Sequence, residues 1–275
     1  MNNMWRYYNN ALIPRTPPHQ SVDGGTLVNN PLWKEKRVLF ARWTSDYDLG
    51  YETSWWYCIK DEPFDINNIN AKKRYEINKG KKNFEVKIIN PSEHTEGLYE
   101  IFIKAMETYG GTLSYDRNKI LKSFVAGPTQ VYFGAFSLED KHLCGYAILD
   151  ESSTYIKYVT HKAIPSYESK AVNAAIVNAI LEYYTDKLSN GIYICDGERN
   201  VYHETSFQSY LEKYFGFRRA YCKLNIKYKF YVKLAVGVLY PFRKIIYRIP
   251  LLAKVGGVLK MQEIYKTKED KQCKI

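Results

Sequence analysis

The sequence predicts an α/β (α+β) fold with a mixed, mostly antiparallel central sheet flanked by helices. A β-rich N-terminal extension precedes this core, and a basic helical tail follows it. The prediction rests first on composition, because 45% of the 275 residues are hydrophobic, enough to bury a core. Strand-like and helix-like periods also alternate through the middle of the chain. Finally, the net charge of +11 is localised, since residues 213–262 hold twelve Lys or Arg and no acidic residue.

The β-rich extension covers residues 1–82. Three apolar runs separated by proline- and glycine-containing loops predict strands: 5–8, 37–43 and 54–60. The third run is apolar on both faces, which predicts a buried strand whose end delivers Lys60 and Asp61. A helix over residues 65–79 follows, and Gly80 is its expected stop.

The middle segment, residues 83–228, carries the clearest periodicity. The predicted strands are 84–89, 130–136, 142–149, 154–160 and 192–195. The predicted helices are 96–109, 116–124, 167–188, and a last one from Thr205 or Ser206 to Gly216. Short polar linkers between strands 130–136, 142–149 and 154–160 indicate an antiparallel meander. Asp196-Gly197 is a turn signal, which is expected to end the last strand.

The tail, residues 229–275, is apolar with regularly spaced cations, and Pro241 and Pro250 divide it. It is too often interrupted by charge to span a bilayer. Two interpretations remain open. Residues 229–260 form short interfacial helices on an anionic membrane surface, or the helices pack one apolar face on the domain and keep their cations in water.

The five cysteines are scattered, with no CxxC pair and no spacing typical of metal ligands. The N-terminal residues lack the apolar core of a signal peptide. We therefore expect a cytoplasmic protein with free thiols and no metal, which associates with the inner membrane face if the tail is interfacial.

The order strand, two helices, three strands, helix, strand, helix, strand resembles the GNAT acyltransferase superfamily. The run Leu-Glu-Lys-Tyr-Phe-Gly at 211–216 is similar to one that precedes the final strands in its FemAB-like branch. The resemblance implies transfer of an acyl group from an acyl-CoA, such as acetyl-CoA, to an amine or hydroxyl of a small or sugar-linked acceptor, in surface polysaccharide biosynthesis. It also implies that the sheet opens between strands 154–160 and 192–195, where the pantetheine arm would lie.

The same resemblance suggests where the donor binds. The end of strand 154–160, the loop after it and the start of the next helix would seat the cofactor, with the candidates Tyr158, Thr160, His161, Ser166 and Tyr167. The sequence departs from the family here, because the region reads IPSYESKAVNA and lacks the family's glycine-containing pyrophosphate motif. Either CoA binds in another mode or the donor is a different molecule.

The catalytic candidates lie in the loop after strand 192–195. His203 and Glu204 are the candidates for the general base, since histidine titrates near neutral pH, although a surface-loop histidine is the alternative. Asp196 is either an acceptor-binding carboxylate or only the turn residue. No residue is assigned as the general acid.

The acceptor candidates combine rings and cations: Trp55, Trp56, Lys60, Asp61, Arg74 and Lys79. In FemAB-like proteins an Arg-x-x-Ile-x-Lys segment borders the acceptor cleft, and here Arg74, Ile77 and Lys79 match it. Such groups suit a sugar that carries a phosphate. The structural alternatives are core aromatics and ordinary charges near a helix C-terminus.

Two further functions remain open. The chain could be a non-catalytic GNAT-like module that binds a membrane or RNA partner through its basic tail. It could also be a FemAB-type transferase whose donor is aminoacyl-tRNA, which the cationic segment would suit.

Overall fold

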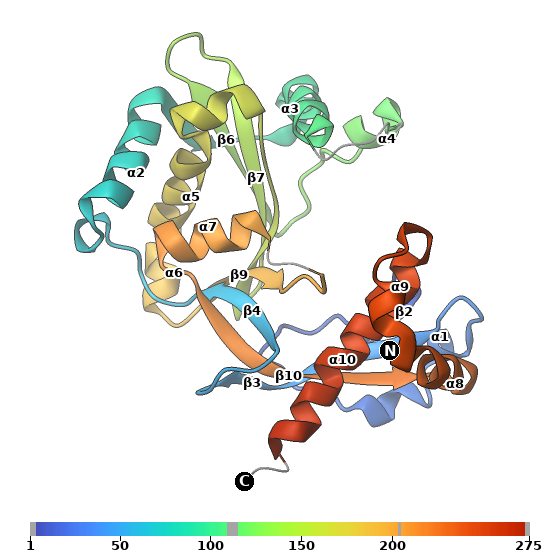
Figure 1. The fold of residues 1–275 in the computed structure, drawn as a ribbon. Helices are drawn as coiled ribbons and strands as arrows, with labels where there is room; N and C mark the ends of the chain where they lie inside the picture. Colours follow the sequence, from blue (N-terminus) through green and yellow to red (C-terminus); the bar gives the residue numbers. More distant parts are fainter. Residues whose placement is uncertain (1–3, 109–114, 203–204, 273–275) are drawn as a thin grey trace. The chain divides into compact units, whose positions relative to one another are not determined.

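The computed structural model describes residues 4–108, 115–202 and 205–272, and it divides into two compact units. The terminal unit contains Met1–Cys58, Glu198–Gln208 and Arg219–Ile275, and the central unit contains Ile59–Gly197 and Ser209–Arg218. The chain therefore passes between units four times: within β4 (Trp55–Lys60), at the end of β9 (Tyr193–Glu198), within α7 (Ser206–Phe215) and at the start of β10 (Arg218–Tyr228), all labelled in Figure 1. The division into segments 1–82, 83–228 and 229–275 stays a prediction.

The central unit holds five strands in the order β9-β8-β7-β6-β5. They are β5 Phe84–Ile88, β6 Gln130–Ser137, β7 Leu143–Glu151, β8 Tyr155–Ala163 and β9 Tyr193–Glu198. Strands β5 to β8 pair antiparallel in sequence order, which confirms the predicted meander. Only β9 pairs parallel, with β8, because helices connect these two strands.

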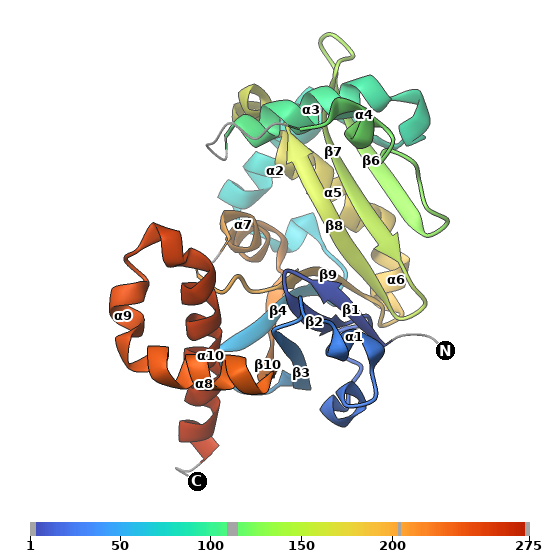
Figure 2. The same ribbon diagram turned by 90° about the vertical axis from the view of Figure 1, so that its right-hand side faces the viewer.

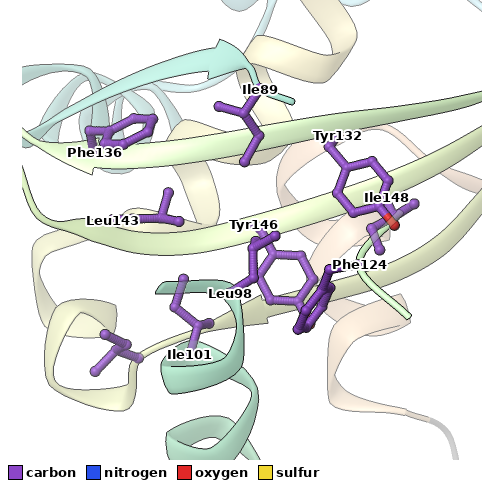
Figure 3. Close-up of a cluster of buried hydrophobic side chains, with 10 residues drawn as sticks. Ile89, Leu98, Ile101, Phe124, Tyr132, Phe136, Leu143, Tyr146 and Ile148 are labelled. Atoms are coloured by element: carbon purple, nitrogen blue, oxygen red, sulfur yellow. The ribbon is translucent and has the colours of Figure 1, made fainter. Parts of the chain in front are cut away.

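Helices cover both faces of this sheet (Figure 1). They are α2 Ala71–Asn83, α3 Thr95–Glu107, α4 Arg117–Leu121, α5 Val172–Tyr183, α6 Thr185–Ser189 and α7 Ser206–Phe215, the last belonging to this unit from Ser209. Short 3₁₀ turns accompany them: η2 Ile66–Asn68, η3 Pro91–Glu93 and η4 Pro165–Lys170. Leu98 and Ile101 of α3 pack on Tyr132, Leu143 and Tyr146 of the sheet, and this cluster fills one face of the core (Figure 3).

Three sequence signals in this unit give a different structure from the expected one. The helix predicted at 167–188 begins only at Val172, because Ala171 adopts a left-handed conformation with φ 67° after the 3₁₀ turn. Strand β9 does not end at Asp196-Gly197 but continues to Glu198, with Gly197 at φ +109°. Helix α2 continues through Gly80 to Asn83.

The terminal unit contains strands in the order β1-β2-β3-β10-β4. They are β1 Trp5–Tyr8, β2 Ala11–Pro14, β3 Phe40–Leu49, β4 Trp55–Lys60 and β10 Arg218–Tyr228. Strand β2 was not predicted. It forms a tight hairpin with β1 through Asn9 and Asn10, whose φ angles of 47° and 64° fit the two-residue turns of hairpins. Near it lie η1 Gly24–Leu27 and α1 Pro31–Lys34.

The tail forms helices, as predicted. They are α8 Phe230–Leu239, η5 Tyr240–Phe242, α9 Arg243–Ile246, η6 Pro250–Leu252 and α10 Ala253–Gln272. Pro241 and Pro250 lie in the 3₁₀ turns that separate these helices, because proline cannot continue a helix from the preceding turn. The predicted fold class is confirmed: mixed, mostly antiparallel strands flanked by helices, with a β-rich N-terminal part and a helical C-terminal part.

Gly80 permits the close packing of α2 on α5. A Cβ added at this buried position would lie 2.6 Å from the carbonyl oxygen of Ala171 and 2.9 Å from the amide nitrogen of Ala175. Both neighbours are backbone atoms, so they cannot rotate away as a flexible side chain would. The glycine therefore serves helix contact here and not helix termination.

We predict opposite effects for two glycine-to-alanine substitutions inside helices. Gly80→Ala should lower the free energy of unfolding by about 1–3 kcal/mol, because the new methyl group overpacks the α2–α5 contact. Gly237→Ala in α8 should raise it by about 0.5–1 kcal/mol, because no atom lies within 4 Å of the added Cβ and alanine favours the helix. Urea unfolding of both variants measures this, and equal stability of the two would contradict the assigned contact.

Candidate functional site

Strands β8 and β9 are paired over only part of their length. Three residue pairs join them: Tyr155 with Tyr193, Ile156 with Ile194, and Lys157 with Cys195. Beyond the last pair, β8 continues to Ala163 and β9 to Glu198. The carboxyl ends of two parallel strands thus run on past their paired segment, at the place where the sequence predicts the sheet to open. Open α/β sheets bind ligands outside such strand ends.

A one-residue bulge in β8 shapes this strand end. Leu149 of β7 lies opposite Tyr158, but Ile148 lies opposite Thr160, so Val159 is the extra residue. Ala147 then lies opposite His161. Because Leu149 and Ala147 point to the same face of β7, Tyr158 and His161 also share one face. Without the bulge, two residues three positions apart would point to opposite faces.

A hydrogen-bonded chain runs from β8 to α5 on this face. The hydroxyl of Tyr158 lies 2.8 Å from Nδ1 of His161, and Nε2 of His161 lies 2.8 Å from Oδ1 of Asn173 in the first turn of α5. An amide oxygen only accepts, so Nε2 carries the imidazole proton and Nδ1 accepts from Tyr158. Burial lowers the pKa of His161 to about 4, which keeps the ring neutral at physiological pH.

Tyr158 is buried, with 4% of its surface exposed. Burial raises its pKa well above the ordinary value, and the negative charge of Asp196 and the nearby Tyr210 raise it further. The phenol therefore stays protonated and can act as a hydrogen-bond donor. Asp196 lies in β9 and not in a turn, so the structure removes the turn interpretation of this carboxylate and places it close to Tyr158.

The start of α5 is packed against α2. The side-chain amide of Asn83 donates to the carbonyl of Lys170 at 3.1 Å, next to the Gly80 contact described above. Ser166, the expected helix cap, is exposed and makes no capping hydrogen bond with its side chain, because the helix begins six residues later. Residues 165–170 form a 3₁₀ turn where the family has its glycine-containing loop.

The two remaining donor-site candidates are held by neighbouring side chains. Tyr167 packs edge-on against Phe84 and its hydroxyl interacts with Cys144; burial raises the pKa of Tyr167 to about 12. Thr160 is half-buried on the opposite face of β8 from Tyr158 and His161, since its partner is Ile148. The structure therefore brings only Tyr158 and His161 together among the five predicted donor residues.

The charged acceptor candidates of the central unit have different environments. Lys60 is buried with 5% exposure, and burial lowers its pKa. Asp61 accepts two hydrogen bonds from Nε of Arg218, at 3.1 and 3.0 Å, and so belongs to an ion pair. Arg74 donates to the carbonyls of Asn67 and Ile69 at 2.9 and 3.0 Å, which ties down the segment before α2. Lys79 is half-buried within α2.

The aromatic acceptor candidates belong to the terminal unit, where they are core residues. Trp55 is 1% exposed and packs with Cys222, Leu224 and Ile264. Trp56 is 2% exposed, and the Arg219 guanidinium lies 4.4 Å from its ring centroid. The two predicted bases, His203 and Glu204, lie outside the described residues.

The sequence analysis missed Asn173 and Tyr210. Asn173 sits on the face of α5 that meets His161, but an asparagine in an apolar helix carries no local signal of its partner. Tyr210 lies in α7, and its closeness to Tyr158 depends on the fold and not on any local sequence pattern. Among the described residues, no group of three or more His, Cys, Asp or Glu side chains is arranged to hold a metal ion.

No protein-family model matches the chain, and no curated protein sequence matches it. Solved structures do. The structure of L-PGS from Bacillus licheniformis matches 86% of this chain over 83% of its own length, with 12% identity and a TM-score of 0.52. The C-terminal domain of a putative lysylphosphatidylglycerol synthetase from Agrobacterium fabrum matches 86% over 84%, with 9% identity and a TM-score of 0.51. A tandem GNAT protein from the clavulanic acid biosynthesis pathway matches 80% over 75%, with 10% identity and a TM-score of 0.46.

At these identities the matches show the fold alone. The chain therefore has a fold similar to that of the two matched structures with TM-scores above 0.5. Membership of the GNAT superfamily and of its FemAB-like branch stays a prediction.

We predict that His161 makes the protein less stable in acid. Its pKa in the folded state, about 4, is below its ordinary value of 6.5, so the unfolded chain binds more protons between these pH values. The free energy of unfolding should therefore fall as the pH drops from 6.5 towards 4, by about 3 kcal/mol for this residue. In His161→Gln, whose side chain can still accept from Tyr158, the free energy of unfolding should change less with pH between 6.5 and 4. Identical slopes for the two proteins would mean that His161 is not buried as a neutral ring.

Proposed function

We propose that the protein is an acyltransferase that moves an acyl group from an activated carrier to an amine or hydroxyl of a small or sugar-linked acceptor. One observation carries this proposal. Lys157 and Cys195 are the last residues that pair β8 with β9, so a protonated tyrosine, Tyr158, and a carboxylate, Asp196, come next in register at the strand ends. Acyl transfer needs a donor of hydrogen bonds to the carbonyl oxygen and a base for the acceptor, and this pair supplies both.

The roles of the two groups follow from their protonation. The acceptor attacks the acyl carbonyl carbon, and negative charge develops on the carbonyl oxygen. Tyr158 stays protonated because its pKa is raised, and its single hydroxyl proton turns from Nδ1 of His161 to donate a hydrogen bond to that oxygen. Asp196 accepts the proton that the acceptor loses and returns it to the leaving group, so the carboxylate is regenerated. His203 and Glu204 remain predicted alternatives for the base.

His161 and Asn173 position the tyrosine. The hydrogen bond to Nδ1 of the neutral ring holds the phenol oxygen of Tyr158 in place before the substrate arrives. When the hydroxyl proton turns to the carbonyl oxygen this hydrogen bond is given up, so His161 and Asn173 fix the position of the phenol and not the direction of its proton. Their proposed role is therefore positioning.

Acyl-CoA is the first donor proposed, as the resemblance implies. One observation favours the second candidate, an aminoacyl ester such as aminoacyl-tRNA. Gly80 and Asn83 pack α2 against the start of α5, and a 3₁₀ turn replaces the glycine-containing pyrophosphate loop there. Of the two matched structures with TM-scores above 0.5, one is named L-PGS and the other is a domain of a putative lysylphosphatidylglycerol synthetase. Lysylphosphatidylglycerol is a lipid that carries an aminoacyl group. This supports aminoacyl transfer as a reaction that the fold can host.

The acceptor is proposed from the cationic candidates. The ammonium group of Lys60 is nearly fully buried, and its lowered pKa reflects that burial. A buried cation is stabilised when it binds an anionic group of a ligand. A phosphate or carboxylate on the acceptor would supply that group. Surface polysaccharide biosynthesis and a cytoplasmic location stay predictions.

The test offers both donor classes to the full-length protein. Acetyl-CoA with a panel of amines and amino sugars reports thiol release, and radiolabelled aminoacyl-tRNA with the same panel reports transfer of the label. If either donor is consumed only when an acceptor is present, the result supports the proposal and identifies the carrier of the acyl group. If neither donor is consumed, the chain is not an acyltransferase of these classes. The alternative of a non-catalytic module that binds a membrane or RNA partner is then favoured.

We predict that Tyr158→Phe lowers kcat roughly a hundredfold with the active donor, because one hydrogen-bond donor to the carbonyl oxygen is lost. KM should change little, since the interaction strengthens in the transition state. The matched control is Tyr183→Phe, which removes a hydroxyl from an exposed tyrosine of α5 in the same unit. Near-normal kcat in Tyr158→Phe, with normal folding, would move the oxyanion role to another group.

A further inference from the structure

The tail exposes large hydrophobic side chains to an unusual degree. Of the nineteen exposed large hydrophobic residues in the described chain, eight lie between positions 230 and 251. They are Phe230, Tyr231, Leu234, Val238, Phe242, Ile245, Ile249 and Leu251. Leu251 is 93% exposed. Single exposed hydrophobic residues are ordinary, but a cluster of this kind marks a surface that binds something.

This exposure is not a failure of the helices to pack. Helices α8, α9 and α10 have their own core, in which Val236, Ile246 and Leu259 are buried. In Figure 2 the chain runs along α8, turns through α9 and returns along α10. The exposed residues Phe230, Leu234 and Val238 repeat every four positions, on a different side of α8 from Val236. These helices therefore have two apolar faces, one used for folding and one not.

The charges around the second face are all positive. Lys233, Lys244, Arg248 and Lys254 are exposed and have no ion pair among the described residues. For the last three of these cations the nearest acidic residue in the sequence is Glu263, which is already engaged, with Nε of Arg243 at 3.0 Å and Nζ of Lys260 at 2.8 Å. The four exposed cations thus have no ion-pair partner in the described parts of the chain.

We propose that this face, the exposed side chains of residues 230–254, docks on the surface of an anionic lipid bilayer. Apolar side chains would enter the region below the headgroups, and the four cations would meet lipid phosphates, as in interfacial helices. No helix in the described parts of the chain is long and apolar enough to cross a membrane. The face would therefore lie in the membrane surface.

Charge complementarity selects the bilayer over other occupants. A second copy of this face would bring four more cations against the first four, with no acidic residue between 213 and 262 to balance them. A nucleic acid would pair with the cations but would leave Phe230, Leu234 and Leu251 against a hydrated phosphate backbone. Of these three occupants, only an anionic bilayer offers negative charge and an apolar interior together.

The test is flotation of the full-length protein with lipid vesicles. Vesicles that contain about one-third phosphatidylglycerol should bind the protein at low salt, and vesicles of phosphatidylcholine alone should bind much less. Salt near roughly 0.5 M should weaken the binding at least about tenfold by screening. The variant Lys244→Gln, Arg248→Gln, Lys254→Gln should bind on the order of a hundredfold more weakly, since each cation counts separately.

A second variant tests the apolar contribution. Leu234→Gln, Ile245→Gln, Leu251→Gln should lose about tenfold or more of the binding, while the matched control Tyr75→Gln, Val125→Gln, at exposed positions outside the tail, should bind like the wild type. Far-ultraviolet circular dichroism checks that every variant is folded. The proposal is overturned if the wild type stays unbound at low salt, or if the tail variants bind as well as the control. It is also overturned if light scattering without lipid shows a dimer that the apolar variant abolishes.

Discussion

The candidate site depends on one extra residue in β8. Val159 shifts the pleat of the strand, so that Tyr158 and His161 lie on the same face and their side chains can bond at 2.8 Å. Asn173 then fixes the imidazole from α5. Both hydrogen bonds are made by neutral groups in a buried place, where a charged imidazole would be costly. The bulge thus brings the imidazole to the tyrosine, while burial keeps the phenol protonated.

The contact between α2 and α5 links stability to the choice of donor. Gly80 allows the helices to approach, and Asn83 binds the carbonyl just before α5. Backbone amides at the start of a helix attract phosphate when they are free to meet it. Here the same region is used for packing, and a 3₁₀ turn ends in the left-handed Ala171. This packing holds the helix firmly, and it is one reason why we propose an aminoacyl ester as the second candidate donor.

Sequence patterns located most elements because their signals are local. Apolar alternation found the meander, and Thr205 caps α7 by accepting from the amide of Gln208. Signals that tertiary contacts override misled the analysis: Gly80 was expected to stop α2, and Asp196-Gly197 to end β9. In the site, Tyr158 and His161 were both predicted as candidates, but their hydrogen bond and the contribution of Asn173 were not. The shared face of residues three apart in a strand exists only after the bulge is known.

The composition of the tail could not show whether its helices pack on the domain or expose apolar residues, because both alternatives assume that each helix has one apolar face. Val236 fits the packing alternative, since it is buried against α9 and α10. Leu234 and Val238, its neighbours in α8, fit the other, with more than half of each side chain exposed. The two alternatives are therefore compatible, because the buried residues, such as Val236, account for the way in which the helices pack together. The exposed residues lie among cations that form no ion pair within the described parts of the chain, which is why we propose a partner outside the chain for them.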